Sequence, residues 1–182
     1  KNKILTELGL QQNKLTILIT VGLGAVERFL QIIEFLRIRK EDFQLIVVAG
    51  KYQKIYEELK NKNFIPPTVI IAWTDRMYDF IRVSDLVICK GGGAITSETL
   101  SAKRPIFIPV FVPGQERGNV YVIKKYKMGF YEEKLDNVFC ILEEILSKNI
   151  NLNEYINNIE SYIKNNPAEK IVKFAYKLNG NL

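Results

Sequence analysis

Short apolar runs alternate along the chain with segments whose apolar residues recur at helical spacing. The run 15–21 (LTILITV) is apolar and rich in β-branched residues, which predicts a buried strand. Glycines at 22 and 24 interrupt it, and apolar residues at 26, 29, 30 and 33 then mark an amphipathic helix. This segment is therefore predicted to form a buried strand, a tight turn and a helix.

The same alternation continues through the rest of the sequence. Further strands are predicted at 43–48, 68–72, 85–89 and 105–110, with a short last one at 130–131. Helices are predicted around 55–59, 77–81, 94–101 and 119–126, and from Leu135 onward with a break near 165–167. This order indicates an α/β fold, a Rossmann-like parallel sheet with helices on both faces. No linker interrupts the 182 residues, so we expect a single domain over 1–182.

The net charge of +6, from 26 Lys and Arg against 20 Asp and Glu, suits nucleic acid, anionic lipid or phosphorylated ligands. Charge alone does not choose among them. The basic residues are mostly scattered along helices, which favours solvated helix faces over a dedicated binding stripe. Aromatic residues follow the strand and helix patterns and form no stacking surface, so no nucleic-acid partner is expected.

The two cysteines, Cys89 and Cys140, lie far apart in a chain without histidine, which excludes an ordinary zinc site. We expect both to be reduced core residues of a cytoplasmic protein. The first ten residues lack the apolar segment of a signal peptide, and no apolar run approaches about 20 residues. Any membrane contact is therefore expected to be peripheral.

Two glycine-containing loops follow predicted strands, where parallel sheets place their ligands. Gly22 and Gly24 allow close approach of an anion, but the loop lacks a full dinucleotide or P-loop motif, and a simple tight turn explains it equally well. The second loop, 90–98 (KGGGAITSE), has three glycines, two hydroxyl side chains and Lys90. It is the better candidate for a phosphate site.

Two further features bear on ligand recognition. Glu98 is placed to accept hydrogen bonds from two ribose hydroxyls, or it simply complements a helix dipole. The loop 113–119 (PGQERGN) carries amide and carboxylate groups suited to a sugar, or it is an ordinary polar loop with Asn119 as helix N-cap. The residues themselves leave both alternatives open.

Four segments together resemble a known family. They are 73–77 (WTDRM), 85–90 (DLVICK), the run from Gly92 to Glu98, and 113–119. In this order they look like the C-terminal donor domain of the glycosyltransferases that include diacylglycerol glycosyltransferases and the UDP-GlcNAc transferase of peptidoglycan synthesis. The resemblance covers about 15–130 and implies that the chain forms the C-terminal half of a GT-B fold.

The resemblance also implies roles for individual residues. Trp73, Thr74 and Met77 would border the uracil, the glycine loop would take the diphosphate, Glu98 would hold the ribose, and Gln115 and Glu116 would face the sugar. The complete set of candidate nucleotide-sugar-binding residues is Gly22, Gly24, Trp73, Thr74, Met77, Lys90, Gly92, Gly93, Ala94, Ile95, Thr96, Glu98, Gln115, Glu116 and Asn119.

The implied reaction is an inverting transfer from a UDP-sugar, without a metal or another cofactor. The sequence agrees in having no Asp-x-Asp pair that would hold a metal against a diphosphate. Backbone dipoles and a cation would then stabilise the departing UDP. The implied acceptor is a lipid, either diacylglycerol or a polyprenyl-linked sugar.

The general base cannot be assigned within this chain, which has no histidine. Family members usually carry a preceding acceptor-binding domain, and here the first predicted strand begins at residue 15. We therefore expect half of an active site, in a truncated form or one subunit of a split transferase. A UDP-sugar 2-epimerase of the same architecture and a non-catalytic nucleotide-binding module are the alternative functions.

Overall fold

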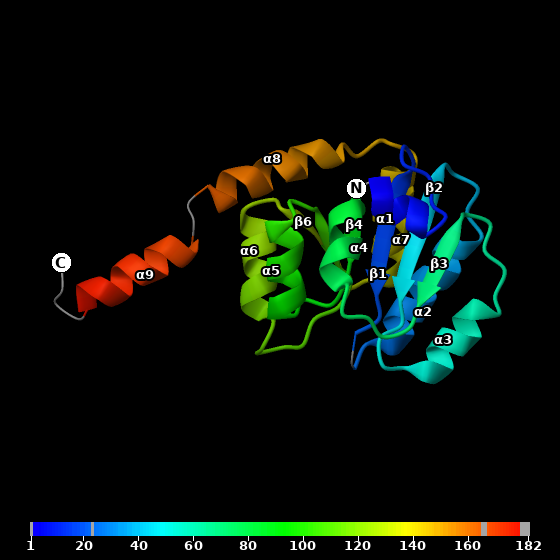
Figure 1. Ribbon diagram of the computed structural model, residues 1–182, viewed down its shortest axis with the longest axis horizontal. Coiled ribbons are helices and arrows are strands. Elements are labelled where there is room, and N and C mark those ends of the chain that lie inside the picture. Colours follow the sequence, from blue (N-terminus) through cyan, green and yellow to red (C-terminus); the bar gives the residue numbers. More distant parts are fainter. Residues whose placement is uncertain (1, 23, 165–166, 179–182) are drawn as a thin grey trace.

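The computed structural model describes residues 2–22, 24–164 and 167–178 (Figure 1). Within these residues the strands are β1 (Leu15–Thr20), β2 (Phe43–Val48), β3 (Thr68–Ile71), β4 (Leu86–Ile88), β5 (Ile106–Ile108) and β6 (Gly129–Tyr131). The helices are α1 (Asn2–Glu7), α2 (Val26–Arg37), α3 (Gln53–Lys60), α4 (Met77–Val83), α5 (Gly93–Ser101), α6 (Arg117–Lys125), α7 (Leu135–Leu146), α8 (Leu152–Ile163) and α9 (Pro167–Leu178).

The strands form one sheet in the order β3-β2-β1-β4-β5-β6, and every neighbouring pair is parallel. The central strand β1 pairs with β2 on one side and with β4 on the other, where Leu18 lies opposite Val87. This strand order is that of the Rossmann fold, with a switch point between β1 and β4. The predicted fold class is confirmed.

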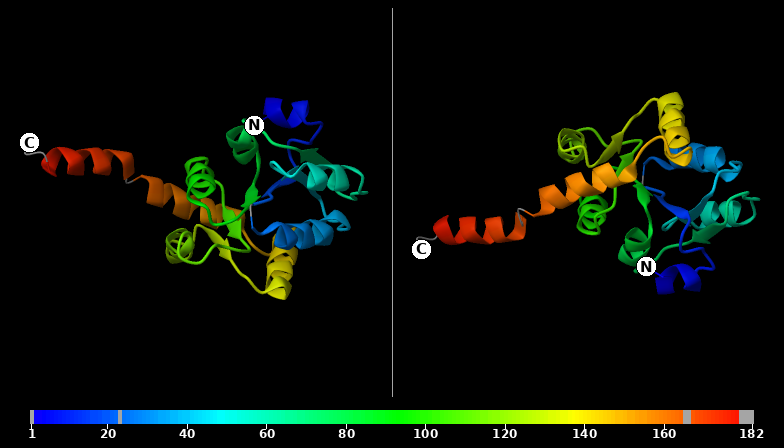
Figure 2. Two further views of the ribbon diagram at one scale, coloured as in Figure 1. Left: turned by 90° about the horizontal axis from the view of Figure 1, so that it is seen from below. Right: turned by 90° about the horizontal axis from the view of Figure 1, so that it is seen from above.

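Helices cover both faces of the sheet (Figure 2). The core on one face is built with α2, α3 and α7, and Phe29 and Leu36 of α2 are fully buried there. The core on the other face is built with α1, α4, α5, α6 and α8. Because the strands are buried on both sides, they are apolar throughout, as β2 illustrates with all six residues buried.

The last two helices differ in how they relate to the sheet. On α8, Ile159 is fully buried, the Tyr155 ring packs 4.5 Å from that of Phe130, and Asn158 donates a hydrogen bond to the Lys127 carbonyl. In contrast, α9 extends away from the body of the molecule (Figures 1 and 2) and exposes apolar side chains, including 71% of Leu178.

Several details differ from the sequence prediction. The helix α1 was not predicted, although it buries Leu5 completely. The helix expected at 119 begins at Arg117, because the Glu116 carbonyl already accepts the N–H groups of Asn119 and Val120. Asn119 is therefore inside the helix and is not its N-cap. Residues 165 and 166, where a helix break was predicted, lie outside the described residues.

The prediction that both cysteines are core residues was half right. Cys89 is buried, whereas Cys140 is exposed on α7. The buried face of α7 consists of Val138, Leu142, Ile145 and Leu146, which follow helical spacing, and a residue two positions after Val138 points to the opposite side. An apolar residue within an amphipathic helix therefore does not have to face the core.

Candidate functional site

The central feature of the candidate site is the crevice at the carboxyl ends of β1 and β4. From these adjacent strands the chain continues into α2 on one face of the sheet and α5 on the other, so the loops diverge. The two glycine loops nevertheless touch at their base, because a Cβ built on Gly22 would lie 3.2 Å from Lys90 Cβ. The fold thus joins two loops that are almost seventy residues apart in sequence.

The start of α5 faces this crevice with its free backbone donors. Gly92 is the N-cap residue, and its carbonyl accepts the first helical hydrogen bond, from Thr96 N–H. The N–H groups of Gly93, Ala94 and Ile95 precede that bond, so the helix itself provides no acceptor for them. Together with the positive end of the helix dipole, they form a local environment that favours an anion.

Nothing in the fold requires three consecutive glycines here. None of Gly91, Gly92 and Gly93 has a positive φ, and a Cβ on Gly92 would have no neighbour closer than 3.7 Å. A Cβ on Gly93 would similarly lie 3.9 Å from its nearest neighbour, the Asn119 side chain. Alanine would fit the backbone and the packing at both positions. Glycine at both is explained if a ligand must approach the backbone closely.

Glu116 links the third predicted loop to the glycine loop. Its side chain is buried, with Oε1 3.1 Å from Lys90 Nζ and Oε2 accepting the Val112 N–H at 2.8 Å. Burial, with the nearby Glu116 carboxylate, also raises the pKa of the Cys89 thiol. Glu116 therefore holds the Lys90 ammonium at the crevice and fixes the start of the loop before α6.

Asn119 makes a second connection between the same two loops. Its Nδ2 donates a hydrogen bond of 2.8 Å to the carbonyl of Gly91. Gln115, by contrast, is exposed beside the buried Glu116. Sequence reasoning missed the structural part played by Asn119 and Glu116, because no local pattern indicates a contact across 28 or 26 positions. Their predicted contacts with a sugar remain predictions.

The segment predicted to border a base follows β3 at the same edge of the sheet. Trp73 is 61% exposed, and the Thr74 hydroxyl accepts the Arg76 N–H in a local turn. Met77 begins α4 and packs partly into the core that α4 shares with α5. Among the described residues, no hydrogen bond or ring contact joins Trp73 to the glycine loop. The exposed ring is thus accessible to a ligand at this edge.

The remaining predicted residues lie along α5. Glu98 is exposed in the second turn of the helix, and no acidic residue occupies the first turn, where a carboxylate complements the dipole best. Thr96 is only 5% exposed, and its buried hydroxyl has no hydrogen-bond partner among the described residues. It lines a hollow of about 340 Å³ between α5, α6 and α8, together with Asn119 and Tyr162.

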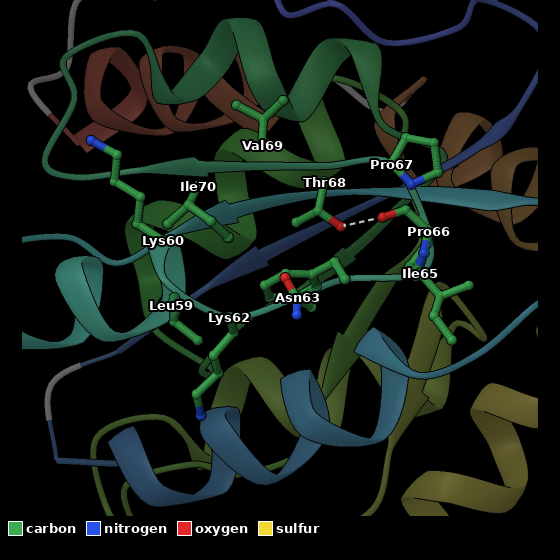
Figure 3. Close-up of a pocket in the computed structure, with 11 residues that line it drawn as sticks. Leu59, Lys60, Lys62, Asn63, Ile65, Pro66, Pro67, Thr68, Val69 and Ile70 are labelled. Atoms are coloured by element: carbon green, nitrogen blue, oxygen red, sulfur yellow. Dashed lines mark hydrogen bonds between the residues drawn. The ribbon is translucent and has the colours of Figure 1, made fainter.

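Other parts of the structure do not add to this site. A hollow of about 560 Å³ lies against the edge strand β3 (Figure 3), where the Thr68 hydroxyl donates to the Pro66 carbonyl. None of the predicted site residues lines it. Within the described residues, no group of three or more Cys, Asp or Glu side chains is arranged to hold a metal ion. No helix among them is long and apolar enough to cross a bilayer.

Solved structures with a similar fold include glycosyltransferases. The chain aligns with Acinetobacter baumannii MurG at a TM-score of 0.62 and 15% identity, covering 85% of this chain and 46% of that one. It aligns with glycosyltransferase VinC, solved in complex with dTDP, at a TM-score of 0.64 and 12% identity, covering 87% and 39%. At these identities the likeness concerns the fold, which is that of the C-terminal half of a GT-B protein.

The family follows from the sequence match. Residues 16–121 match the model of the glycosyltransferase family 28 C-terminal domain, and the chain belongs to that family. A processive diacylglycerol β-glucosyltransferase of Bacillus licheniformis is 27% identical over 175 residues, which cover 94% of this chain and 45% of the relative. The chain thus spans about half the length of the curated relatives that it matches. The family match includes β1, β4, the two glycine loops and the loop before α6.

Proposed function

We propose that this chain binds a UDP-sugar at the carboxyl ends of β1 and β4 and forms the donor half of a glycosyltransferase that acts on a lipid acceptor. The observation that carries the proposal is the glycine pair Gly92 and Gly93, which neither the backbone conformation nor the packing requires. It lies within the family match and at the start of α5, where a diphosphate finds free N–H donors.

Each part of the crevice has a role in this proposal. The N–H groups at the start of α5 and the Lys90 ammonium bind the diphosphate and stabilise its charge as UDP departs. Trp73, Thr74 and Met77 border the uracil, and Glu98 accepts hydrogen bonds from the ribose hydroxyls. Gln115 faces the sugar. The transfer proceeds with inversion and without a metal.

The acceptor and the general base come from outside this chain in the proposed enzyme. Support comes from the relatives, of which this chain matches only about half, and from their names, which describe glucosyl transfer to diacylglycerol. Diacylglycerol is therefore the first acceptor to test, and a polyprenyl-linked sugar the second. An enzyme that uses such an acceptor acts at a membrane surface, in this proposal on the cytoplasmic side.

Calorimetric titration of the chain with UDP, UDP-glucose and ADP tests the donor site directly. We expect saturable binding of UDP and UDP-glucose, and weaker binding of ADP because the proposed contacts of Trp73, Thr74 and Met77 are to uracil. A second assay follows transfer of labelled glucose from UDP-glucose to diacylglycerol in detergent. The chain alone should bind the donor and transfer nothing.

Two results would contradict the proposal in different ways. Equal affinity for ADP and UDP, or no affinity for either, would contradict the assignment of the crevice as a UDP-sugar site. Measurable transfer by the chain alone would leave the donor site intact but show that the acceptor site and the base lie within these 182 residues.

A further inference from the structure

The outer face of α6 carries a concentration of basic and aromatic side chains that the donor site does not use. Arg117, Tyr121, Lys124 and Lys125 are spaced four, seven and eight residues from the first, so they share one face of the helix. Val120 and Ile123 are buried on the opposite face. With the two residues that follow the helix, this α6 patch consists of Arg117, Tyr121, Lys124, Lys125, Tyr126 and Lys127, all exposed.

The positive charge of the α6 patch is not neutralised by neighbours. The sequence has no Asp or Glu from 117 to 131. Among the described residues, none of the four patch cations forms an ion pair, whereas Lys62, Arg76 and Lys103 each do. Glu154 of α8 lines the same hollow as Lys124 and Lys127 without forming an ion pair with either, and Glu133 is hydrogen-bonded to Tyr131.

Helix-dipole stabilisation explains only part of this charge. Lys124 and Lys125 lie in the last turn of α6, where cations are favourable. Arg117, however, is the first residue of the helix, where a positive charge is unfavourable, and the preceding Glu116 is already engaged by Lys90. Cations at both ends of the helix, with no acidic residue between them, therefore need another explanation.

Two exposed tyrosines make the α6 patch suitable for contact with a binding partner. Tyr121 is 60% exposed and Tyr126 43% exposed, and Lys125 Nζ lies 5.5 Å from the centre of each ring. The Tyr126 ring also packs 4.8 Å from that of Tyr162. Tyrosines among lysines suit the headgroup level of a bilayer, where the ring meets acyl chains and the hydroxyl meets water.

We propose that the α6 patch binds the surface of an anionic lipid bilayer. Four unpaired cations complement acidic headgroups, and the two exposed tyrosines add amphipathic contact. Single-stranded nucleic acid fits less well, because bases stack on free aromatic faces, and here Lys125 lies over both rings while Tyr126 also packs against Tyr162. This surface is distinct from the donor site and does not depend on the proposed transfer.

Sedimentation with lipid vesicles tests the α6 patch without nucleotide or acceptor. The chain should bind vesicles of phosphatidylcholine with 30% phosphatidylglycerol, bind pure phosphatidylcholine much less, and detach in about 0.5 M salt, where charges are screened. Replacing Lys124 and Lys125 together by glutamine should weaken binding about twenty- to thirtyfold, at roughly fivefold for each cation. Arginine at both positions should keep it.

The matched control replaces Lys54 and Lys60 of α3 by glutamine. These lysines are exposed, Lys60 lies 5.5 Å from the Tyr56 ring, and α3 flanks the opposite end of the sheet (Figure 1). This variant has the same net charge as Lys124→Gln/Lys125→Gln and should bind vesicles like the parent, while circular dichroism shows that both variants are folded. Equal losses in the two variants would mean that net charge alone drives binding, and the proposal would fail. It would also fail if the α6 variant bound vesicles normally, or if the patch bound single-stranded RNA and no vesicles.

Discussion

Replacing Gly92 by alanine tests whether this glycine is required for folding or for ligand binding. Gly92 has φ −65° and ψ 145°, a conformation open to any residue, and a Cβ there would lie 3.7 Å from Glu116 Oε1. Alanine is a poorer N-cap than glycine, at a cost of about 0.5–1 kcal/mol, but it lowers the entropy of the unfolded chain by a similar free energy. The free energy of unfolding should therefore change by less than about 1 kcal/mol.

The effect of Gly92→Ala on ligand binding should be much larger. A methyl group at the start of α5 would keep a phosphate from the neighbouring N–H groups, and the loss of one charge-assisted hydrogen bond costs about 1.5–3 kcal/mol. UDP affinity should fall roughly ten- to a hundredfold. Calorimetry measures this change, and urea unfolding of the same samples measures stability.

Gly118 provides the matched control for the Gly92 experiment. It lies in the first turn of α6, and a Cβ there would have no neighbour within 4 Å. Gly118→Ala should raise the free energy of unfolding by about 0.4–1 kcal/mol. If Gly92→Ala binds UDP as tightly as the parent, the glycine run is not a ligand site. If it unfolds more easily by over 2 kcal/mol, the fold needs the glycine and our reading of the packing is wrong.

Three further results are expected. Gly129→Ala should destabilise the chain by about 1–3 kcal/mol or more in urea unfolding, because its Cβ would lie 2.0 Å from the Ile106 carbonyl oxygen; an unchanged midpoint would contradict this. Glu98→Gln should weaken UDP binding roughly ten- to a hundredfold and reduce the preference for UDP over an analogue without ribose hydroxyls, and unchanged affinity would end the ribose assignment. UDP affinity should be the same in excess EDTA; a loss that magnesium restores would show that a metal takes part.

The sheet was predictable from sequence because its signal is local. Each strand is an apolar run bounded by glycine, proline or polar residues, and β2 was predicted with its bounds correct. Errors occurred where tertiary contacts decide the structure. The start of α6 is set by the Glu116 carbonyl, and α1 is held by burial of Leu5 against a distant part of the chain.

The sequence predicts the individual segments of the site, but it does not predict the side-chain contacts that join them. Glycine loops and charged residues are visible in the sequence, and the family resemblance put them in order. The ion pair of Lys90 with Glu116 and the hydrogen bond from Asn119 to Gly91 have no local signature. The resemblance implies that Glu116 faces the sugar, and Asn119 is among the candidate nucleotide-sugar-binding residues. In the structure the Glu116 and Asn119 side chains join the loop before α6 to the glycine loop.

The position of the site depends on strand order, which the alternation of strands and helices does not determine. Several orders would satisfy the same pattern, and in most of them the loops after β1 and β4 would be separated by another strand. In the observed order these two strands are neighbours, with Ile19 opposite Ile88, and their helices leave to opposite faces. In this arrangement the first loop and the start of α5 lie at one crevice. Strand order is a property of the whole fold and not of any single motif, so no local pattern predicts it.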